Sequence, residues 1–512
     1  MMFYHPVRVF FYNLEVTKMK CYNYNIKGQR YRQNIMIFWD VGKRIIMKRG
    51  VFMKNSVKRI VALACAVACC MPIIGGCGKQ ETASGEKITL KLWTKPSQDA
   101  KDYQIQIYNR KMAALREKFP NIIFEEGMRA SGTDYRQEYD KALMAGTAPA
   151  FYTEFSYTDI PGRIANGTVA DITKYVADWD LKKEGKVLDT FDDAISADGK
   201  WYAVPLKAYT MATLCNIKTI EAAGGNKEDL PKTWEEFAEF GQKATDLSIP
   251  RMGYSLIGMD WCAWPFTAWV WSAGGEMVKK NDDGTYKLTF NEEPGVDAAM
   301  FMNEMIWKYK MTQKDILLGY NDIVKNVING SSCFSFLGIS NLNQDKLDEY
   351  GLKIADFIDI PMPVKDESIE RSALAGGEVI TFNPTLTEEE LKAAFEVVEY
   401  LYFSDERMQV DCDEIKEFGL TNVFIPGRVD WYDERLAANE GVTEEQIKAL
   451  ETMRENAKPE PYCDHWSDIK SQLVSPLQKI YLTEGITREE AKALLDECAE
   501  KLYSLYPDTF KK

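Results

Sequence analysis

The chain has 512 residues, 46% of them hydrophobic, and a formal net charge of −14 at pH 7. Residues 1–76 carry 13 Lys and Arg against 2 Asp and Glu, which leaves residues 77–512 at −25. So acidic a surface repels nucleic acid and anionic lipid and argues against both as partners, while the length supports a large core in more than one lobe.

An export signal is the first predicted element. A short basic segment begins at Met53, and residues 60–76 are apolar, with Pro72 among them. A run of about 17 residues suits the hydrophobic part of a signal peptide better than a membrane span. The basic, apolar and small segments are complete if translation starts at Met53 or Met47. We therefore predict that residues 1–52 are a mis-assigned upstream extension; a genuine cytoplasmic extension is the alternative.

The signal, residues 53–76, ends at a cysteine. Ile74-Gly75-Gly76-Cys77 resembles the bacterial lipobox, which implies that Cys77 is lipidated and becomes the new N-terminus. Two acyl chains such as palmitate anchor a protein stably where one does not. Residues 77–85 then form a polar, lipidated tether. An ordinary signal with a coincidental cysteine is the alternative.

Alternating strand and helix patterns follow the tether. Residues 87–93 alternate with the period of a strand, and residues 121–126 and 150–152 form two further apolar strands. Stripes at helical spacing lie between them, within 108–115 and 135–143. This order predicts βαβ units and a parallel sheet.

Four later helix starts carry a capping box, in which a threonine and an acid or amide three residues on satisfy each other's backbone N–H groups. They begin at Thr233, Thr387, Thr443 and Thr487. The final third of the chain is therefore predicted to be rich in helices.

Cysteine and histidine give little sign of a metal or a disulfide framework. Six scattered cysteines follow Cys77, and one disulfide among them is possible without being assignable from the sequence. Cys463 and His465 are close, but no second ligand pair follows at zinc spacing. We expect no metal and no cofactor, and we interpret His465 as a surface or packing residue.

Several stretches, in order, resemble extracellular solute-binding protein family 1, the maltose-binding-protein-like substrate-binding lipoproteins of ABC importers. They are KITLKLW, YDKALMAGTAPAFYTEF, ADGKWYAVPLKAYTMATLCN, LPKTWEEF, SAGGEM, VINGSSCFSFLG and GITREEAKALLDECAEKL. The resemblance covers nearly all of residues 86–512, and its specificity comes from the order and spacing of these stretches.

The resemblance implies an α/β, two-lobed periplasmic-binding-protein-like fold of type II, each lobe a sheet flanked by helices, with a hinge between them. It places chain crossings near 207–211, 328–330 and Phe403. The implied lobes are an N-terminal lobe of residues 86–206 and 330–403, and a C-terminal lobe of residues 207–329 and 404–512.

A carbohydrate site needs aromatic rings for the flat sugar faces and charged or amide groups for the hydroxyls. The segment 260–276 holds four tryptophans, of which Trp269 and Trp271 are expected in the core. Pro265 fits the first turn of a helix, which leaves Trp261 and Trp264 in the loop just before it, and Trp264-Pro265 resembles the family's ligand-stacking position.

Other expected ligand contacts lie at strand ends, in the first crossing and in a glycine-rich loop at 376–378. The complete predicted set is Trp264, Trp261, Tyr209, Glu154, Ser156, Tyr157, Trp93, Lys95, Gly377 and Glu378. For most of them core packing, hinge structure or ordinary surface is the alternative.

The resemblance implies a monomeric lipoprotein on the extracellular face of the cell membrane, typical of a Gram-positive bacterium. It would capture a carbohydrate, in our interpretation an oligosaccharide, and deliver it to ABC permease subunits served by a separate ATPase. The alternatives are a binding protein for a peptide or polyamine, or an anchored glycoside hydrolase. We expect no enzyme, because no local catalytic motif stands out.

Overall fold

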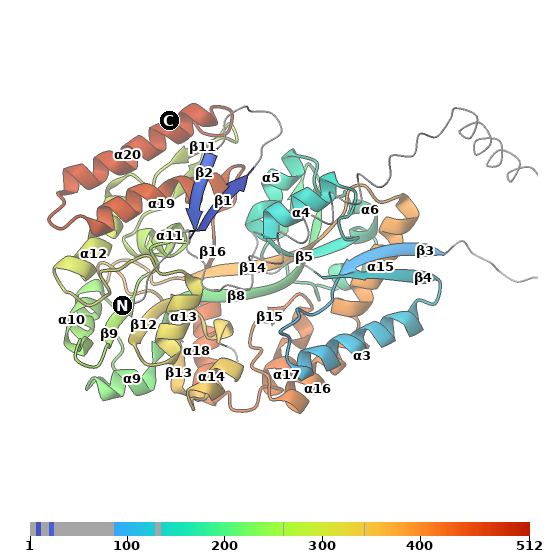
Figure 1. Ribbon diagram of the computed structural model, residues 1–512, viewed down its shortest axis with the longest axis horizontal. Coiled ribbons are helices and arrows are strands. Elements are labelled where there is room, and N and C mark those ends of the chain that lie inside the picture. Colours follow the sequence, from blue (N-terminus) through green and yellow to red (C-terminus); the bar gives the residue numbers. More distant parts are fainter. Residues whose placement is uncertain (1–6, 12–19, 25–86, 129–134, 260, 343) are drawn as a thin grey trace, which may run out of the picture. The chain divides into compact units, whose positions relative to one another are not determined.

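The computed structural model describes residues 7–11, 20–24, 87–128, 135–259, 261–342 and 344–512, in two compact units, 1–84 and 85–512 (Figure 1). In the first unit, β1 (Val7–Phe11) pairs antiparallel with β2 (Lys20–Tyr24). The rest of the predicted extension, the signal peptide, Cys77 and the whole tether lie outside the described residues.

The second unit begins with the predicted strand and helix alternation. β3 (Ile88–Trp93), α3 (Asp102–Lys118), β4 (Ile122–Gly127), α4 (Tyr135–Met144) and β5 (Phe151–Ser156) follow in order, and β3 pairs with β4 in parallel. The βαβ prediction is therefore confirmed for this part of the chain.

Two long strands organise the rest of the sheet. β8 (Ala203–Asn216) pairs antiparallel with β14 (Ala373–Phe382) along its first nine residues. The last residues of β8 pair instead with β12 (Ser332–Leu337) and β13 (Phe357–Ile360), while β5 joins the far edge of β14. Figure 1 shows β8 and β14 side by side at the centre of this unit.

The remaining elements are short strands and the helices that flank the sheet. They are η1 (Tyr157–Asp159), α5 (Ile160–Ala165), α6 (Thr173–Val176), α7 (Asp180–Lys183), α8 (Asp192–Ile195), β6 (Ser196–Ala197), β7 (Lys200–Trp201), α9 (Ile217–Ala222), α10 (Trp234–Ala244), β9 (Met252–Ser255), α11 (Ala263–Ser272), β10 (Val278–Lys280), β11 (Tyr286–Leu288), α12 (Glu293–Trp307), α13 (Tyr320–Ile328), η2 (Ile339–Asn341), α14 (Gln344–Glu349), η3 (Ile354–Asp356), α15 (Glu388–Phe403), α16 (Asp405–Phe418), β15 (Ile425–Pro426), η4 (Val429–Trp431), α17 (Tyr432–Ala437), α18 (Glu444–Glu455), β16 (Ala457–Pro459), α19 (Trp466–Leu482) and α20 (Arg488–Leu505).

All four predicted capping boxes form, at the starts of α10, α15, α18 and α20. At α10 the Glu236 backbone N–H donates to Thr233 Oγ1 at 3.3 Å, and the Thr233 N–H donates to Glu236 Oε2 at 3.0 Å. Each box satisfies two donors that a helix start leaves unpaired, so the helix ends could be predicted locally.

Buried side chains form one large core and smaller ones on the other side of the crossing strands. The large core surrounds α11 and α12 and includes Trp269, which is 0% exposed. Two smaller clusters, together called here the N-terminal cores, include Leu90, Met112 and Phe382 in one and Tyr157 in the other. Met211 and Leu374 belong to the large core, so β8 and β14 connect both regions.

This packing differs from the expected grouping of residues 330–403 with the N-terminal lobe. β12 pairs with β8 and β9, and its Phe334 and Phe336 are buried in the large core. The chain returns to the N-terminal cores only within β14, since Ala373 packs in the large core and Ile380 in an N-terminal one. The difference arises because strand pairing between distant segments decides where β12 lies.

The segment after Phe403 also differs from the expected crossing. Arg110 of α3 makes two hydrogen bonds to Glu417 of α16, at 2.6 and 2.7 Å. The chain enters the large core again later, with Val423 and then α18. The six cysteines of the second unit from Cys215 to Cys498 are buried and free, so no disulfide forms among these six.

Candidate functional site

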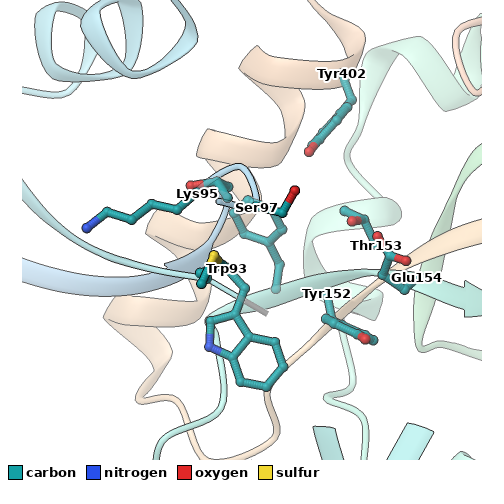
Figure 2. Close-up of a pocket in the computed structure, with 10 residues that line it drawn as sticks. Trp93, Lys95, Ser97, Tyr152, Thr153, Glu154 and Tyr402 are labelled. Atoms are coloured by element: carbon teal, nitrogen blue, oxygen red, sulfur yellow. The ribbon is translucent and has the colours of Figure 1, made fainter. Parts of the chain in front are cut away.

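A cavity of about 240 Å³ lies at the end of β3 and along the first residues of β5 (Figure 2). Its lining residues are Trp93, Thr94, Lys95, Ser97, Met128, Phe151, Tyr152, Thr153, Glu154 and Tyr402. The Trp93 ring meets that of Tyr152 edge-on, with centroids 5.9 Å apart. Figure 2 shows the Lys95 side chain extending away from Tyr152 and Glu154. The structure therefore brings three predicted residues, Trp93, Lys95 and Glu154, to one cavity.

An ion pair on the central strands adjoins Glu154. Glu378 of β14 and Lys207 of β8 are cross-strand partners, and Lys207 Nζ lies 3.0 Å from Glu378 Oε2. Burial raises the pKa of Glu378, the Lys207 ammonium lowers it, and the nearby Glu154 charge raises it again. Since both members of the pair remain partly exposed, they offer a charged donor and acceptor for ligand hydroxyls.

Tyr209 lies beside this pair on β8, opposite Gly376 of β14. Burial raises the pKa of Tyr209 well above its ordinary value, and the charges of Glu378 and Glu460 add to the rise. An ideal Cβ on Gly376 would lie 2.3 Å from the Tyr209 ring, so only glycine leaves room for the ring in this position. The sequence prediction placed 376–378 in a loop; the structure places these residues inside β14.

The Gly376 contact gives a prediction. Replacing Gly376 with Ala should displace the Tyr209 ring, because keeping an extra carbon in this packed position would cost about 1–3 kcal/mol of folding free energy. The displaced Tyr209 ring should then weaken ligand binding by about tenfold. Titration calorimetry of the purified variant measures this loss. Gly162→Ala is the matched control, since nothing lies within 4 Å of its added Cβ, and it should bind normally. Equal affinity in both variants would contradict the role given to Gly376.

Trp261, Trp264 and Tyr320 form a separate group, called here the aromatic wall, and none of them is among the residues that line the cavity. The Trp261 ring lies 5.7 Å from that of Trp264 and 6.2 Å from that of Tyr320, between centroids. Trp261 is 46% exposed, whereas Trp264 is only 9% exposed and packs against Phe336. Of the two predicted tryptophans, Trp261 is therefore the one with a ring face available to a ligand.

Tyr320 connects this wall with the ion pair. The pKa of Tyr320 is raised to about 12. Burial is the main cause, the hydrogen bond with Asn341 opposes the rise, and the charge of Glu378 adds to it. Tyr320 and Tyr209 thus both lie within electrostatic reach of Glu378. Sequence reasoning missed Lys207, Tyr320 and Asn341 as site residues. Tyr320 simply starts an amphipathic helix after Gly319, and no local pattern singles it out.

Three predicted contacts serve the framework instead. Tyr157 is fully buried, its hydroxyl lies 3.0 Å from the Ala375 and Glu460 carbonyl oxygens, and its ring stacks on Phe191 at 4.1 Å. The Ser156 hydroxyl accepts from the Thr158 N–H and caps η1. Gly377 leaves room for the Phe191 ring, 2.2 Å from an ideal Cβ. None of these positions presents a side chain to the cavity.

Asp359 supports the turn that carries Asn341. It is fully buried on β13, and its two oxygens accept from the Ile339 N–H at 3.1 and 2.9 Å. Burial raises the pKa of Asp359, and the hydrogen bond from Ile339 opposes this rise only in part. The resulting pKa is about 7. Asp359 thus binds protons more tightly in the folded than in the unfolded state.

A pH dependence follows from Asp359. Its protonated form favours folding, so its contribution is fully present below about pH 4 and is lost as the pH rises to 7. From pH 4 to pH 8 the native chain loses this contribution and Asp359→Asn does not. The difference in unfolding free energy between the two proteins should therefore shift by on the order of 3 kcal/mol in favour of the variant. Denaturant titrations at both pH values measure the difference. The exposed Asp282→Asn is the control, and a pH-independent difference for Asp359→Asn would refute the assignment.

His465 and Cys463 show no ligand geometry. The His465 ring stacks on Tyr506 at 3.7 Å, and its Nδ1 lies 2.8 Å from Asp468 Oδ2. Within the described residues, no group of three or more His, Cys, Asp or Glu side chains is arranged to hold a metal. Nor does any helix there have the length and apolar character that a membrane crossing requires.

The amino-acid sequence is similar to bacterial proteins that bind solutes outside the cell. The family model of the bacterial extracellular solute-binding proteins matches residues 121–405, more than half of the chain. A maltotriose-binding protein of Pyrococcus abyssi is 27% identical over 201 residues, which cover 38% of this chain and 38% of that relative.

Two solved structures are similar over nearly the whole second unit. An ABC transporter solute-binding protein of Thermotoga lettingae with bound α-D-tagatose has a TM-score of 0.66 at 20% identity, over 82% of this chain and 100% of its own. Maltose-bound MalE3 of T. maritima has a TM-score of 0.63 at 21% identity, over 82% and 99%. The predicted two-lobed α/β fold is confirmed, and the chain belongs to the bacterial extracellular solute-binding protein family.

Proposed function

We propose that this protein captures a carbohydrate, in particular an oligosaccharide, between its two lobes, and that it is a binding protein rather than an enzyme. The observation that carries the proposal is the half-exposed indole of Trp261 beside Tyr320, which lies within electrostatic reach of Glu378, the partly exposed partner of Lys207. A ring face for the sugar C–H groups and charged groups for its hydroxyls are what a sugar site needs.

The proposed ligand contacts follow from exposure. Trp261, Tyr209, Tyr320, Glu378 and Lys207 form the central part, and Trp93, Lys95 and Glu154 extend it into the cavity of Figure 2. Trp264 supports the Trp261 ring from behind. The maltotriose-binding relative, and the similar structures with bound tagatose and maltose, favour a sugar over a peptide or polyamine.

The lobes proposed from the packing have boundaries other than those expected from the resemblance. The crossings lie in β8 near Tyr209, in β14 near Gly376, and between α16 and α18. An N-terminal lobe then contains residues up to about 208, the second half of β14, and α15 and α16. Closure would bend the chain at these three places.

The cellular role rests on the residues before the second unit. The signal-like order of 53–76 and the lipobox-like sequence before Cys77 support export and lipid anchoring on the outer face of the membrane. A monomer held there would deliver its sugar to ABC permease subunits with a separate ATPase. Mass spectrometry of protein from cells tests this, since it should find a diacylated Cys77 at the N-terminus.

Thermal denaturation against a solute panel tests the binding function. The panel contains mono- and oligosaccharides from two to six units, peptides and polyamines. A ligand at 100 times its Kd that binds only the folded protein adds about 2.7 kcal/mol to the unfolding free energy. We expect this gain in unfolding free energy with one class of oligosaccharide. A gain with peptides or polyamines alone, or turnover of the sugar, would overturn it.

A further inference from the structure

Two elements on opposite sides of the crossing strands touch each other directly. Lys101 Nζ lies 2.7 Å from Asp345 Oδ1, and the Tyr103 hydroxyl donates to Asp345 Oδ2 at 3.2 Å. Lys101 and Tyr103 lie at the start of α3, which packs into an N-terminal core through Met112. Asp345 lies on α14, which packs into the large core through Leu347.

The Tyr103 side chain is held for this contact from two sides. Its ring lies 5.9 Å from the Phe418 ring of α16, on the side of α3. Burial raises the pKa of Tyr103, and the charge of Asp345 raises it further, so the hydroxyl stays a donor at neutral pH. One carboxylate thus accepts a charge-assisted bond from Lys101 and a hydroxyl bond from Tyr103.

Each half of the contact is continuous with a wall of the proposed binding site. On one side, Trp93, Lys95 and Ser97 line the cavity, and the same segment leads into Lys101. On the other side, η2 carries Asn341, the partner of Tyr320, and leads into Asp345. A ligand that draws the two walls together would therefore also bring Asp345 to α3.

We infer that Asp345, Lys101 and Tyr103 form a latch that holds the two sides of the site closed, with Asp345 as a positioning residue that does not touch the ligand. The latch goes beyond the proposed function, since it concerns closure and holds for any ligand of this site. Ion pairs this exposed are weak, so the latch biases an equilibrium and can still open.

Amide hydrogen exchange of the ligand-free protein tests the latch. Asp345→Asn should speed exchange two- to fivefold within 93–103, on the opposite side, as well as in α14, and Lys101→Met should do the same. The double variant should exchange no faster than Asp345→Asn alone, because loss of the Asp345 carboxylate already removes the ion pair with Lys101. Glu445→Gln is the matched control: it breaks the Lys227–Glu445 pair of 2.8 Å, which involves neither α3 nor α14, and should leave 93–103 unchanged.

Two results would overturn the latch. One is faster exchange confined to the element that carries the substitution. The other is a double variant whose effect is the sum of both single effects. Because the test uses no sugar, its failure is distinct from a failure of the sugar panel.

Discussion

Trp261→Ala is expected to lower the affinity for the bound oligosaccharide by about 30-fold while leaving the folded protein nearly as stable as before. Removing an aromatic anchor from the centre of a binding site costs about 2 kcal/mol of binding free energy. The free energy of unfolding should change little, because Trp261 is 46% exposed and is not a core residue. Titration calorimetry with the sugar that gives the largest thermal shift measures the loss.

Trp307→Ala is the control for this affinity change. Trp307 lies on α12 and donates its indole N–H to the Tyr481 carbonyl at 2.8 Å, in contact with the large core and not with the site. This variant should lose stability and keep its affinity. Unchanged affinity in Trp261→Ala would mean that Trp261 is ordinary surface and that another ring, such as Trp93, carries the sugar.

Trp269→Ala is expected to lower the free energy of unfolding by about 3–5 kcal/mol, the largest effect on stability among the tryptophans of α11. Trp269 is 0% exposed, and its ring lies 5.4–6.1 Å from the rings of Trp234, Phe237, Tyr254 and Phe301. Its loss leaves a cavity that this aromatic cluster cannot refill, and the cost is a large part of the 5–15 kcal/mol typical of folded proteins.

Guanidinium denaturation of Trp269→Ala and Trp261→Ala, side by side, checks this contrast. Both substitutions remove a tryptophan side chain, one from the loop before α11 and one from α11 itself, so composition is matched. The expected pattern is reciprocal, with stability lost in one variant and affinity lost in the other. Similar losses of stability would show that Trp261 is packed as tightly as Trp269.

Local chemistry explains which parts of the fold could be predicted from the sequence. The capping boxes at Thr233, Thr387, Thr443 and Thr487 involve residues three apart, so each is complete in a short window. The first three strands follow from alternation and apolar runs. The overall two-lobed fold came from resemblance, because order and spacing along the whole chain carry information that no single motif does.

Non-local pairing explains what could not be predicted. β12 belongs to the large core because it pairs with β8, more than a hundred residues earlier, and no pattern within β12 specifies that partner. The choice between Trp261 and Trp264 depends in the same way on Phe336, which covers Trp264. Gly376 was expected in a glycine-rich loop, but it lies inside β14 and makes room for Tyr209 on the neighbouring strand.

A crystal structure of the protein grown with the oligosaccharide that stabilises it most would test the central claim most directly. We expect one sugar ring on the exposed face of Trp261, with its hydroxyls bonded to Glu378 and Lys207 and the next unit directed toward the cavity of Figure 2. A sugar bound elsewhere on the surface, or a site left unchanged at saturating sugar, would contradict it.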